Sequence, residues 1–217
     1  MELSRIPLQE ALRYLGVRGE APPELLAQVE QAWAELLPVC RPRHVWRLLE
    51  RSALEEMGLE FPGEDLRTLL RDCGRVVLFA LTLGDGPEAL MRRATLTSPT
   101  KALILDACAS AACEQACDDL QAALEARLCT QGCFPTDRFS PGYGDLPLTV
   151  QPALLQALDA QRRCGITLSD TYIMMPRKSV TAIFGLADKP QGKRARGCAF
   201  CSMRQNCSFR KAGITCA

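Results

Sequence analysis

Two stretches, one near the start of the chain and one in its middle, have the residue pattern of long helices. Residues 22–37 carry apolar side chains at helical spacing, and this run opens on prolines and ends before Pro38. From Thr100 to Leu128 the sequence is rich in Ala, Leu, Glu and Gln, which predicts the longest helix of the chain. Weaker patterns predict shorter helices over residues 7–15, 65–73, 87–95 and 148–164.

The strand pattern is clearest in the middle of the chain. Arg75–Leu83 is apolar on both faces, as is typical of a strand in the centre of a sheet. Arg43–Glu50 and Glu55–Phe61 are weaker candidate strands. Thr167–Met175 and Ser179–Ala187 are predicted to pair as a hairpin around Pro176-Arg177-Lys178. Together these elements predict an α+β fold, with a mixed or antiparallel twisted sheet flanked by helices.

Length and charge divide the chain unequally. Its 217 residues fit one domain with a small appendage. We expect that domain over residues 1–187, with helices in 1–40 and a core in 41–187, and a separate tail over 188–217. The net charge is +1, but the charges are unevenly distributed. Residues 189–217 hold seven basic side chains and no acid, so the rest of the chain is acidic. The basic residues of the tail are Lys189, Lys193, Arg194, Arg196, Arg204, Arg210 and Lys211.

The sequence carries no sign of export or membrane insertion. No apolar run approaches the roughly 20 residues that span a bilayer, and residues 1–10 lack a signal-peptide pattern. We therefore expect a cytoplasmic protein, with neither a membrane nor a nucleic acid as partner. In that compartment the twelve cysteines should be mostly reduced thiols or metal ligands rather than disulfides.

The stretch 138–147 is the strongest candidate for a binding loop. Pro141, Gly142 and Gly144 make it unsuitable for a helix and suitable for presenting backbone groups to a ligand. Arg138 carries a planar fork that binds carboxylates bidentately, and Tyr143 offers a flat ring with one hydroxyl. These groups suit a small zwitterionic or nucleotide-like ligand. The alternative is a packed surface turn whose arginine pairs with a neighbouring acid.

Several single residues carry weaker signals. Glu114 lies on a predicted helix of small residues and needs a partner, which a ligand's ammonium or ribose hydroxyl would supply. Cys113 and Cys117 share one face of that helix, and we expect them to act as small buried hydrophobic residues. Trp33 belongs to an apolar stripe and is expected in the core. His44, the only histidine, is expected to be an exposed bystander.

The tail gathers four of the twelve cysteines: Cys198, Cys201, Cys207 and Cys216. A Cys-x2-Cys pair can hold a metal or a cluster, and four thiolates suit zinc or an iron–sulfur cluster equally. The basic surroundings favour thiolates. Three alternatives stay open: an iron–sulfur cluster, a zinc ion, and unligated or redox-active thiols. The usual radical S-adenosylmethionine and Rossmann motifs do not occur.

The loop also resembles a known signature. Arg138-x-x-x-Gly142-Tyr143 followed by Pro147 is similar to the S-adenosylmethionine-binding motif in the reactivation domain of cobalamin-dependent methionine synthase. The resemblance covers roughly residues 75–187. The small size of this chain and its Cys-rich tail are closer to the free-standing form of this domain. The further segments that carry the resemblance are 112–116, 166–176 and 179–185.

The resemblance implies a function in methionine biosynthesis. The chain would bind S-adenosylmethionine and support reductive methylation of cob(II)alamin to methylcobalamin, as a methyltransferase component acting only with its corrinoid partner. Cobalamin would be bound by the partner, a methionine synthase chain, and contacted here, with a flavodoxin or ferredoxin as electron donor. The implied ligand-binding residues are Arg138, Ser140, Pro141, Gly142 and Tyr143, with Glu114 as a weaker member. The alternative function is a metal or iron–sulfur electron-transfer or interaction module without methyl transfer.

Overall fold

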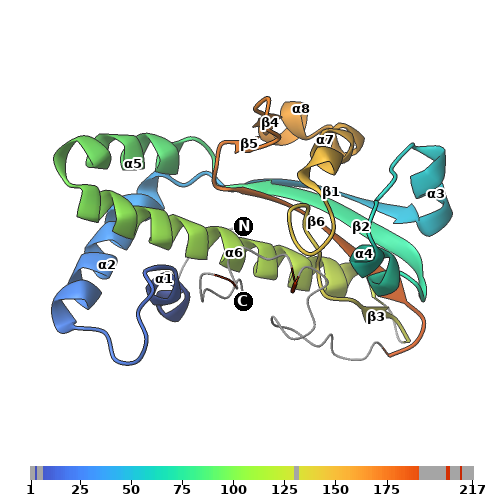
Figure 1. Cartoon of the computed structure of the whole chain (residues 1–217), viewed down its shortest axis with the longest axis horizontal. Helices are drawn as coiled ribbons and strands as arrows, with labels where there is room; N and C mark the ends of the chain where they lie inside the picture. Colours follow the sequence, from blue (N-terminus) through green and yellow to red (C-terminus); the bar gives the residue numbers. More distant parts are fainter. Residues whose placement is uncertain (1–2, 4–6, 130–131, 191–203, 206–210, 212–217) are drawn as a thin grey trace. The chain divides into compact units, whose positions relative to one another are not determined.

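The computed structural model describes residues 3, 7–129, 132–190, 204–205 and 211 (Figure 1). Its helices are α1 (Leu8–Tyr14), α2 (Pro23–Leu36), α3 (Arg51–Glu56), α4 (Glu64–Leu69), α5 (Gly86–Thr97), α6 (Pro99–Leu128), α7 (Gln151–Leu158) and α8 (Ala160–Cys164), with 3-10 turns η1 (Leu37–Val39) and η2 (Leu148–Val150). Its strands are β1 (Arg43–Glu50), β2 (Cys73–Thr82), β3 (Phe134–Pro135), β4 (Thr167–Leu168), β5 (Met174–Met175) and β6 (Ser179–Ala187).

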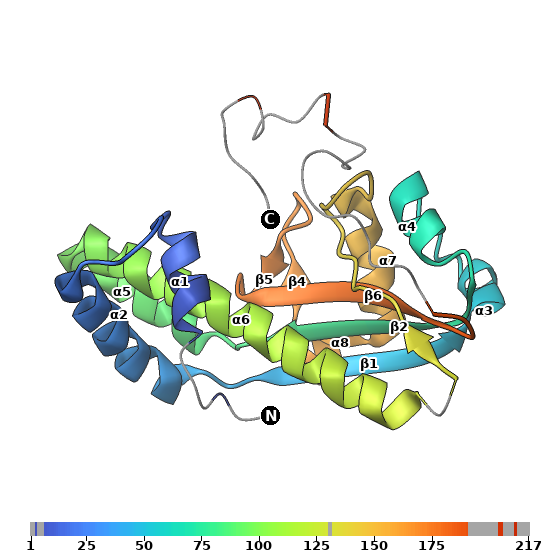
Figure 2. The ribbon, with the colours of Figure 1, turned by 90° about the horizontal axis from the view of Figure 1, so that it is seen from below.

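The main sheet is antiparallel, with four strands in the order β1-β2-β6-β3 (Figure 2). Both inner strands, β2 and β6, are buried along nearly their whole length. The predicted central position of Arg75–Leu83 is therefore confirmed. At one edge, Phe134 of β3 pairs with Ala187 of β6. The sheet and its flanking helices confirm the predicted α+β class.

The chain folds into two compact units, and each unit is built from three separate segments of the chain. The first contains residues 1–45, 80–124 and 159–180, and the second contains 46–79, 125–158 and 181–217. Helices α1, α2, α5 and α8 and most of α6 belong to the first unit. Helices α3, α4 and α7 belong to the second, with β3 and the loop that follows it.

In the first unit, α2 packs beside α6 (Figures 1 and 2). Trp33 is 7% exposed, so its predicted core position is confirmed. The predicted burial of Cys113 and Cys117 on α6 is confirmed as well. A salt bridge at the surface of the pair joins Lys101 Nζ to Glu35 Oε1 at 2.7 Å.

In the second unit, the core forms around two aromatic rings. Phe79 and Phe184 are both fully buried and meet edge to face, with ring centroids 6.4 Å apart. A buried polar contact lies in the same unit, where the Thr181 hydroxyl donates to the Gln151 side-chain oxygen at 2.7 Å. Because the groups satisfy each other, neither leaves an unpaired polar atom in the core.

The predicted strand Glu55–Phe61 is wrong. Arg51–Glu56 forms α3 instead, and the turn after it is closed by the Leu59 N–H, which donates to the Leu54 carbonyl at 2.8 Å. Leu59 is buried from the turn, while Met57 is 39% exposed, so the stretch resembles a strand only in composition.

The helix predicted over Leu148–Cys164 is also wrong as one element. Asp159 adopts a left-handed conformation with φ of 51° and separates α7 from α8. Its carboxylate accepts a hydrogen bond from Arg162 Nε at 2.6 Å. Asp tolerates this conformation better than most side chains, because a short polar side chain can form local hydrogen bonds.

The hairpin predicted between Thr167–Met175 and Ser179–Ala187 does not form. Residues 167–168 pair with 174–175 around their own turn, and Ser179–Ala187 pairs in the main sheet. In that turn the Ser169 hydroxyl accepts a hydrogen bond from the Ile173 N–H at 3.1 Å. Side chains that bond to the local backbone favour turns over continuous strands.

Candidate functional site

The predicted binding loop is attached to the sheet in the second unit. Phe139 forms an isolated bridge with Ile183 of β6, through two backbone hydrogen bonds of 2.7 and 2.8 Å. The Phe139 side chain is 4% exposed and anchors the loop in the core. Its neighbours Arg138 and Ser140 are half-buried. The alternation of buried and accessible residues therefore turns Arg138 and Ser140 away from the core.

Backbone groups of the loop bond mainly to one another. The Gly142 N–H donates to the Leu146 carbonyl at 2.8 Å, and the Tyr143 N–H donates to the Ser140 carbonyl at 3.2 Å. These donors are therefore engaged within the loop, contrary to the expectation that the loop offers them to a ligand. Its accessible chemistry lies in side chains, among them the Tyr143 ring, which is 55% exposed. Pro141 is buried.

Gly142 has φ of 91°, a conformation that side chains rarely adopt. A Cβ atom there would lie 3.1 Å from Leu148 Cδ2. We expect Gly142→Ala to lower the free energy of unfolding by about 1–2 kcal/mol, because a non-glycine residue in left-handed backbone costs about that much. Chemical denaturation measures the change. A loss of ligand affinity without a loss of stability would instead assign this glycine to ligand contact.

An acidic residue of the loop caps a neighbouring helix. The Asp145 carboxylate accepts hydrogen bonds from the N–H of Glu64 at 2.6 Å and from the N–H of Asp65 at 3.3 Å. The residue that precedes α4 is Gly63, which has no side chain to do this. Asp145 lies 81 residues away along the chain, so no local sequence pattern indicates this cap. Asp145 thus fixes the far end of the loop on α4.

Asp145→Ala is expected to destabilise the protein by about 1 kcal/mol, because the first amides of α4 lose their acceptor. Asp145→Asn is the matched control, since its side-chain oxygen still accepts while the charge is gone. We expect the Asn variant to recover at least half of the loss in urea denaturation. Equal loss in both variants would mean that charge, rather than the hydrogen bonds, holds the loop to α4.

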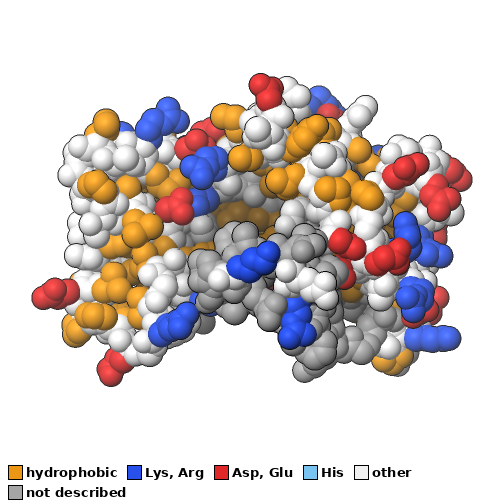
Figure 3. All heavy atoms as spheres, viewed as in Figure 1, with side chains coloured by type: hydrophobic (Ala, Val, Ile, Leu, Met, Phe, Trp, Pro, Cys, Tyr) orange, Lys and Arg blue, Asp and Glu red, His pale blue; other side chains and the backbone are white. Residues whose placement is uncertain are grey.

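A carboxylate of α4 lies against this end of the loop. A Cβ atom added to Gly144 would collide with the Asp65 carboxylate, so Asp65 lies directly against the loop backbone. Figure 3 shows red side chains, with blue ones among them, over the region of α3 and α4, where Glu64 is exposed and pairs with Arg67. Negative charge beside an exposed aromatic ring suits a ligand that carries positive charge. No pattern in the sequence links Asp65 to this site.

Glu114 belongs to the first unit and is half-buried on α6. Its charge acts on Arg13 of α1. The pKa of Arg13 is raised, chiefly by its hydrogen bond to Glu10, and Glu114 adds to this effect. A cation of the chain itself therefore interacts with Glu114, which weakens the argument that a ligand must supply one. That Glu114 shares a site with Arg138 stays a prediction.

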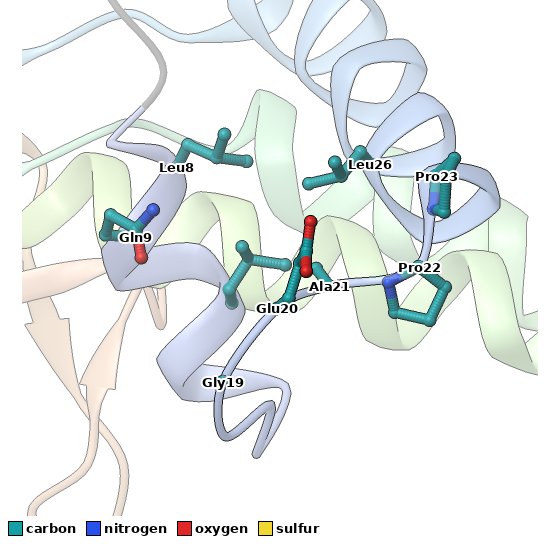
Figure 4. Close-up of a pocket in the computed structure, with 9 residues that line it drawn as sticks. Leu8, Gln9, Gly19, Glu20, Ala21, Pro22, Pro23 and Leu26 are labelled. Atoms are coloured by element: carbon teal, nitrogen blue, oxygen red, sulfur yellow. The ribbon is translucent and has the colours of Figure 1, made fainter.

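Two pockets occur in the first unit. One, of about 530 Å³, lies between α1, α2 and their connection and is lined mainly by Leu and Pro side chains (Figure 4). The other, of about 280 Å³, is lined by Asp85, Glu88 and Arg92 of the α5 region and by Met175 and Pro176. None of the predicted site residues that the structure describes lines either pocket.

The structure describes only some of the remaining residues for which predictions were made. The tail cysteines Cys198, Cys201, Cys207 and Cys216 lie outside the described residues. Within the ranges that are described, no three His, Cys, Asp or Glu side chains come together as metal ligands. The single histidine, His44, is exposed as predicted. Over the same ranges, no helix has the length and apolar character needed to cross a membrane.

Comparison with known proteins identifies the fold. No protein-family model matches the sequence, and no curated protein matches it. Among solved structures, the chain is similar to the MetH reactivation domain bound to AdoHcy, with a TM-score of 0.60 and 15% sequence identity. The match covers 95% of this chain and 83% of the other. The α+β fold described above is therefore that of the reactivation domain, which confirms the fold relation implied by the sequence resemblance.

Proposed function

We propose that this chain binds S-adenosylmethionine and serves as a reactivation module for a cobalamin-dependent methionine synthase. The observation that carries the proposal is the fold similarity, over 95% of the chain, to a reactivation domain solved with AdoHcy bound. The Arg138–Tyr143 motif adds separate support, because it rests on the residues of one loop and not on the fold.

The loop supplies groups that fit this ligand. Arg138 would bind the carboxylate of the methionyl part through its planar fork. The exposed ring of Tyr143 would pack against the ligand, with Ser140 and the Pro141-Gly142 turn shaping the surface beside it. The nearby carboxylates of Asp65 and Asp145 favour a ligand with cationic sulfonium and ammonium groups.

The reaction requires a second protein. Cobalamin would be held by a methionine synthase chain, and the methyl donor together with one electron would return cob(II)alamin to methylcobalamin. The part of this chain is to hold S-adenosylmethionine in one orientation beside that partner, so catalysis rests on proximity. A flavodoxin or ferredoxin would supply the electron.

Calorimetric titration of the full chain with S-adenosylmethionine and S-adenosylhomocysteine tests the binding step. We expect saturable binding of both ligands, because they share the carboxylate, the ammonium and the adenosine. Methionine alone and adenosine alone are the controls and should bind more weakly, since each makes only part of the contacts. Absence of saturable binding of either full ligand contradicts the proposal.

The Cys-rich tail gives a separate prediction. If Cys198, Cys201, Cys207 and Cys216 ligate an iron–sulfur cluster, anaerobically purified protein should absorb broadly in the visible range and bleach with dithionite. Cys201→Ser should abolish that absorbance. Colourless protein with one stoichiometric zinc would instead assign the tail to a structural zinc site.

A further inference from the structure

Two cysteines at the entrance to β3 hold their sulfur atoms side by side. The Cys133 thiol donates a hydrogen bond to the Cys129 sulfur, with an Sγ–Sγ distance of 2.7 Å. An S–S bond is about 2.05 Å long, so the two sulfurs lie within about 0.7 Å of bonding distance. Only a small side-chain movement separates this pair of thiols from a disulfide.

Accessibility sets these two thiols apart. Cys129 and Cys133 are both half-exposed. The other cysteines among the described residues are buried: Cys40, Cys73, Cys108, Cys113, Cys117 and Cys164. Exchange with an external disulfide needs a sulfur that the reagent can reach. Within this set, proximity and accessibility coincide at Cys129 and Cys133.

The backbone on either side holds the pair in place. Cys129 follows the last residue of α6, and its N–H donates to the Glu125 carbonyl at 2.9 Å. Cys133 precedes β3, whose residue Phe134 pairs with Ala187 of β6. A disulfide here would close a ring of only five residues, and so small a ring adds little loop-closure entropy. The arrangement suits a reversible reaction better than a permanent structural link.

The environment of Cys129 favours one order of reaction. Burial raises the pKa of the Cys129 thiol, and its neighbour Cys133 and the Glu125 carboxylate raise it further, while Arg75 opposes them. The thiolate is the attacking species, so the raised pKa of Cys129 disfavours a first attack by that sulfur. Once Cys133 is bonded to another sulfur it can no longer carry a charge, which removes its electrostatic effect on the pKa of Cys129.

We propose that Cys129 and Cys133 form a reversible dithiol–disulfide site that exchanges with low-molecular-weight disulfides of the glutathione class. In the first step the Cys133 sulfur bonds to one sulfur of the external disulfide, and the other sulfur leaves as a thiol. In the second step the Cys129 sulfur bonds to Cys133 and displaces the remaining external thiol. Two protein thiols are oxidised to one disulfide, one external disulfide is reduced to two thiols, and both protein thiol hydrogens pass to the released thiols.

This site is independent of the proposed function, although the two are neighbours along the chain. Cys133 precedes Arg138 by five residues, and the segment between them includes Thr136, which exchanges hydrogen bonds with Gly185 of β6. Closing the disulfide would join the end of α6 to the strand that leads into the binding loop.

Peptide mapping of the full chain tests the proposal without any ligand. The protein is equilibrated in buffers of increasing glutathione disulfide to glutathione ratio, quenched in acid, alkylated and digested with trypsin. Cleavage after Arg127 and Arg138 yields the peptide Leu128–Arg138, which contains Cys129 and Cys133 and no other cysteine. In reducing buffer we expect this peptide with two alkyl groups. In oxidising buffer we expect it unlabelled and lighter by two hydrogens.

Controls separate this site from the other cysteines. A variant with all four tail cysteines replaced by serine, and Cys164→Ser, should both keep the transition. Cys133→Ser should lose it and leave Cys129 labelled or joined to glutathione. The proposal is overturned if the peptide stays doubly labelled at every ratio, or if Cys129 or Cys133 is linked to a tail cysteine. Protection of both thiols by a bound metal that a chelator removes would overturn it as well.

Discussion

Replacing Arg138 by Ala is expected to weaken binding of S-adenosylmethionine by about ten- to hundredfold. A hydrogen-bonded contact to a charged group contributes roughly 1.5–3 kcal/mol, and each 1.4 kcal/mol corresponds to about a factor of ten in affinity. Arg138 is half-buried beside Phe139, whose backbone bonds to β6 keep this part of the loop in place without the guanidinium. The fold should therefore survive the substitution, and isothermal titration should report the change in affinity.

Two further variants make the Arg138 test specific. Arg138→Lys keeps the positive charge but loses the planar fork, so we expect an affinity between those of wild type and Arg138→Ala. Arg71→Ala removes an exposed arginine from the same unit and should leave affinity unchanged. Equal affinity of wild type and Arg138→Ala would remove this residue from the site. Unfolding of Arg138→Ala would assign the guanidinium to loop structure instead.

Replacing Asp106 by Ala is expected to lower the free energy of unfolding by about 2–3 kcal/mol. The Lys178 ammonium is 12% exposed and lies 2.9 Å from Asp106 Oδ1 and 2.8 Å from the Ser110 hydroxyl. Removing one partner of a buried ion pair costs about 3–5 kcal/mol, because the remaining charge stays buried without compensation. The expected cost is smaller here, since the Asp106 side chain is 49% exposed.

Lys178→Met is the matched control for this ion pair. It removes the buried charge and keeps an apolar stem, while Asp106 can be solvated. We therefore expect a loss of about 1 kcal/mol, clearly less than for Asp106→Ala. Urea denaturation with unchanged m-values would make the two losses comparable. A larger loss for Lys178→Met than for Asp106→Ala would show that the hydrogen bonds from the ammonium to the Asp106 carbonyl and the Ser110 hydroxyl, rather than the ion pair with the Asp106 carboxylate, stabilise the first unit.

Asp65 shows why part of the candidate site was not predictable from the sequence. It lies on α4, far from the loop along the chain, and reaches Gly144 only through tertiary packing. Glu114 depends on the fold in the same way. A carboxylate on a helix of small residues predicts a partner for its charge, and the fold brings Arg13 of α1 close enough for the two charges to interact. That Glu114 shares a site with Arg138 stays a prediction. Charge pairing between distant segments has no local sequence signal.

What the sequence by itself determined is the identity and order of the strongly patterned elements. The apolar run of β2 and the helical periodicities of α2 and α6 follow from burial and local propensity, and these were predicted correctly. The loop motif at 138–143 was also evident, because Pro, Gly, Arg and Tyr each restrict or supply a definite local chemistry.

Only the tertiary structure decided how the weak strands pair and which hydrogen bonds the binding loop forms. Residues 167–175 fold back on themselves and β6 enters the main sheet, because strand pairing depends on partners distant in the chain. The same holds for the thiols of Cys129 and Cys133. Their spacing was visible in the sequence, but the 2.7 Å approach of their sulfurs depends on where α6 ends and β3 begins. Local patterns set the elements, and long-range packing sets which of their side chains meet.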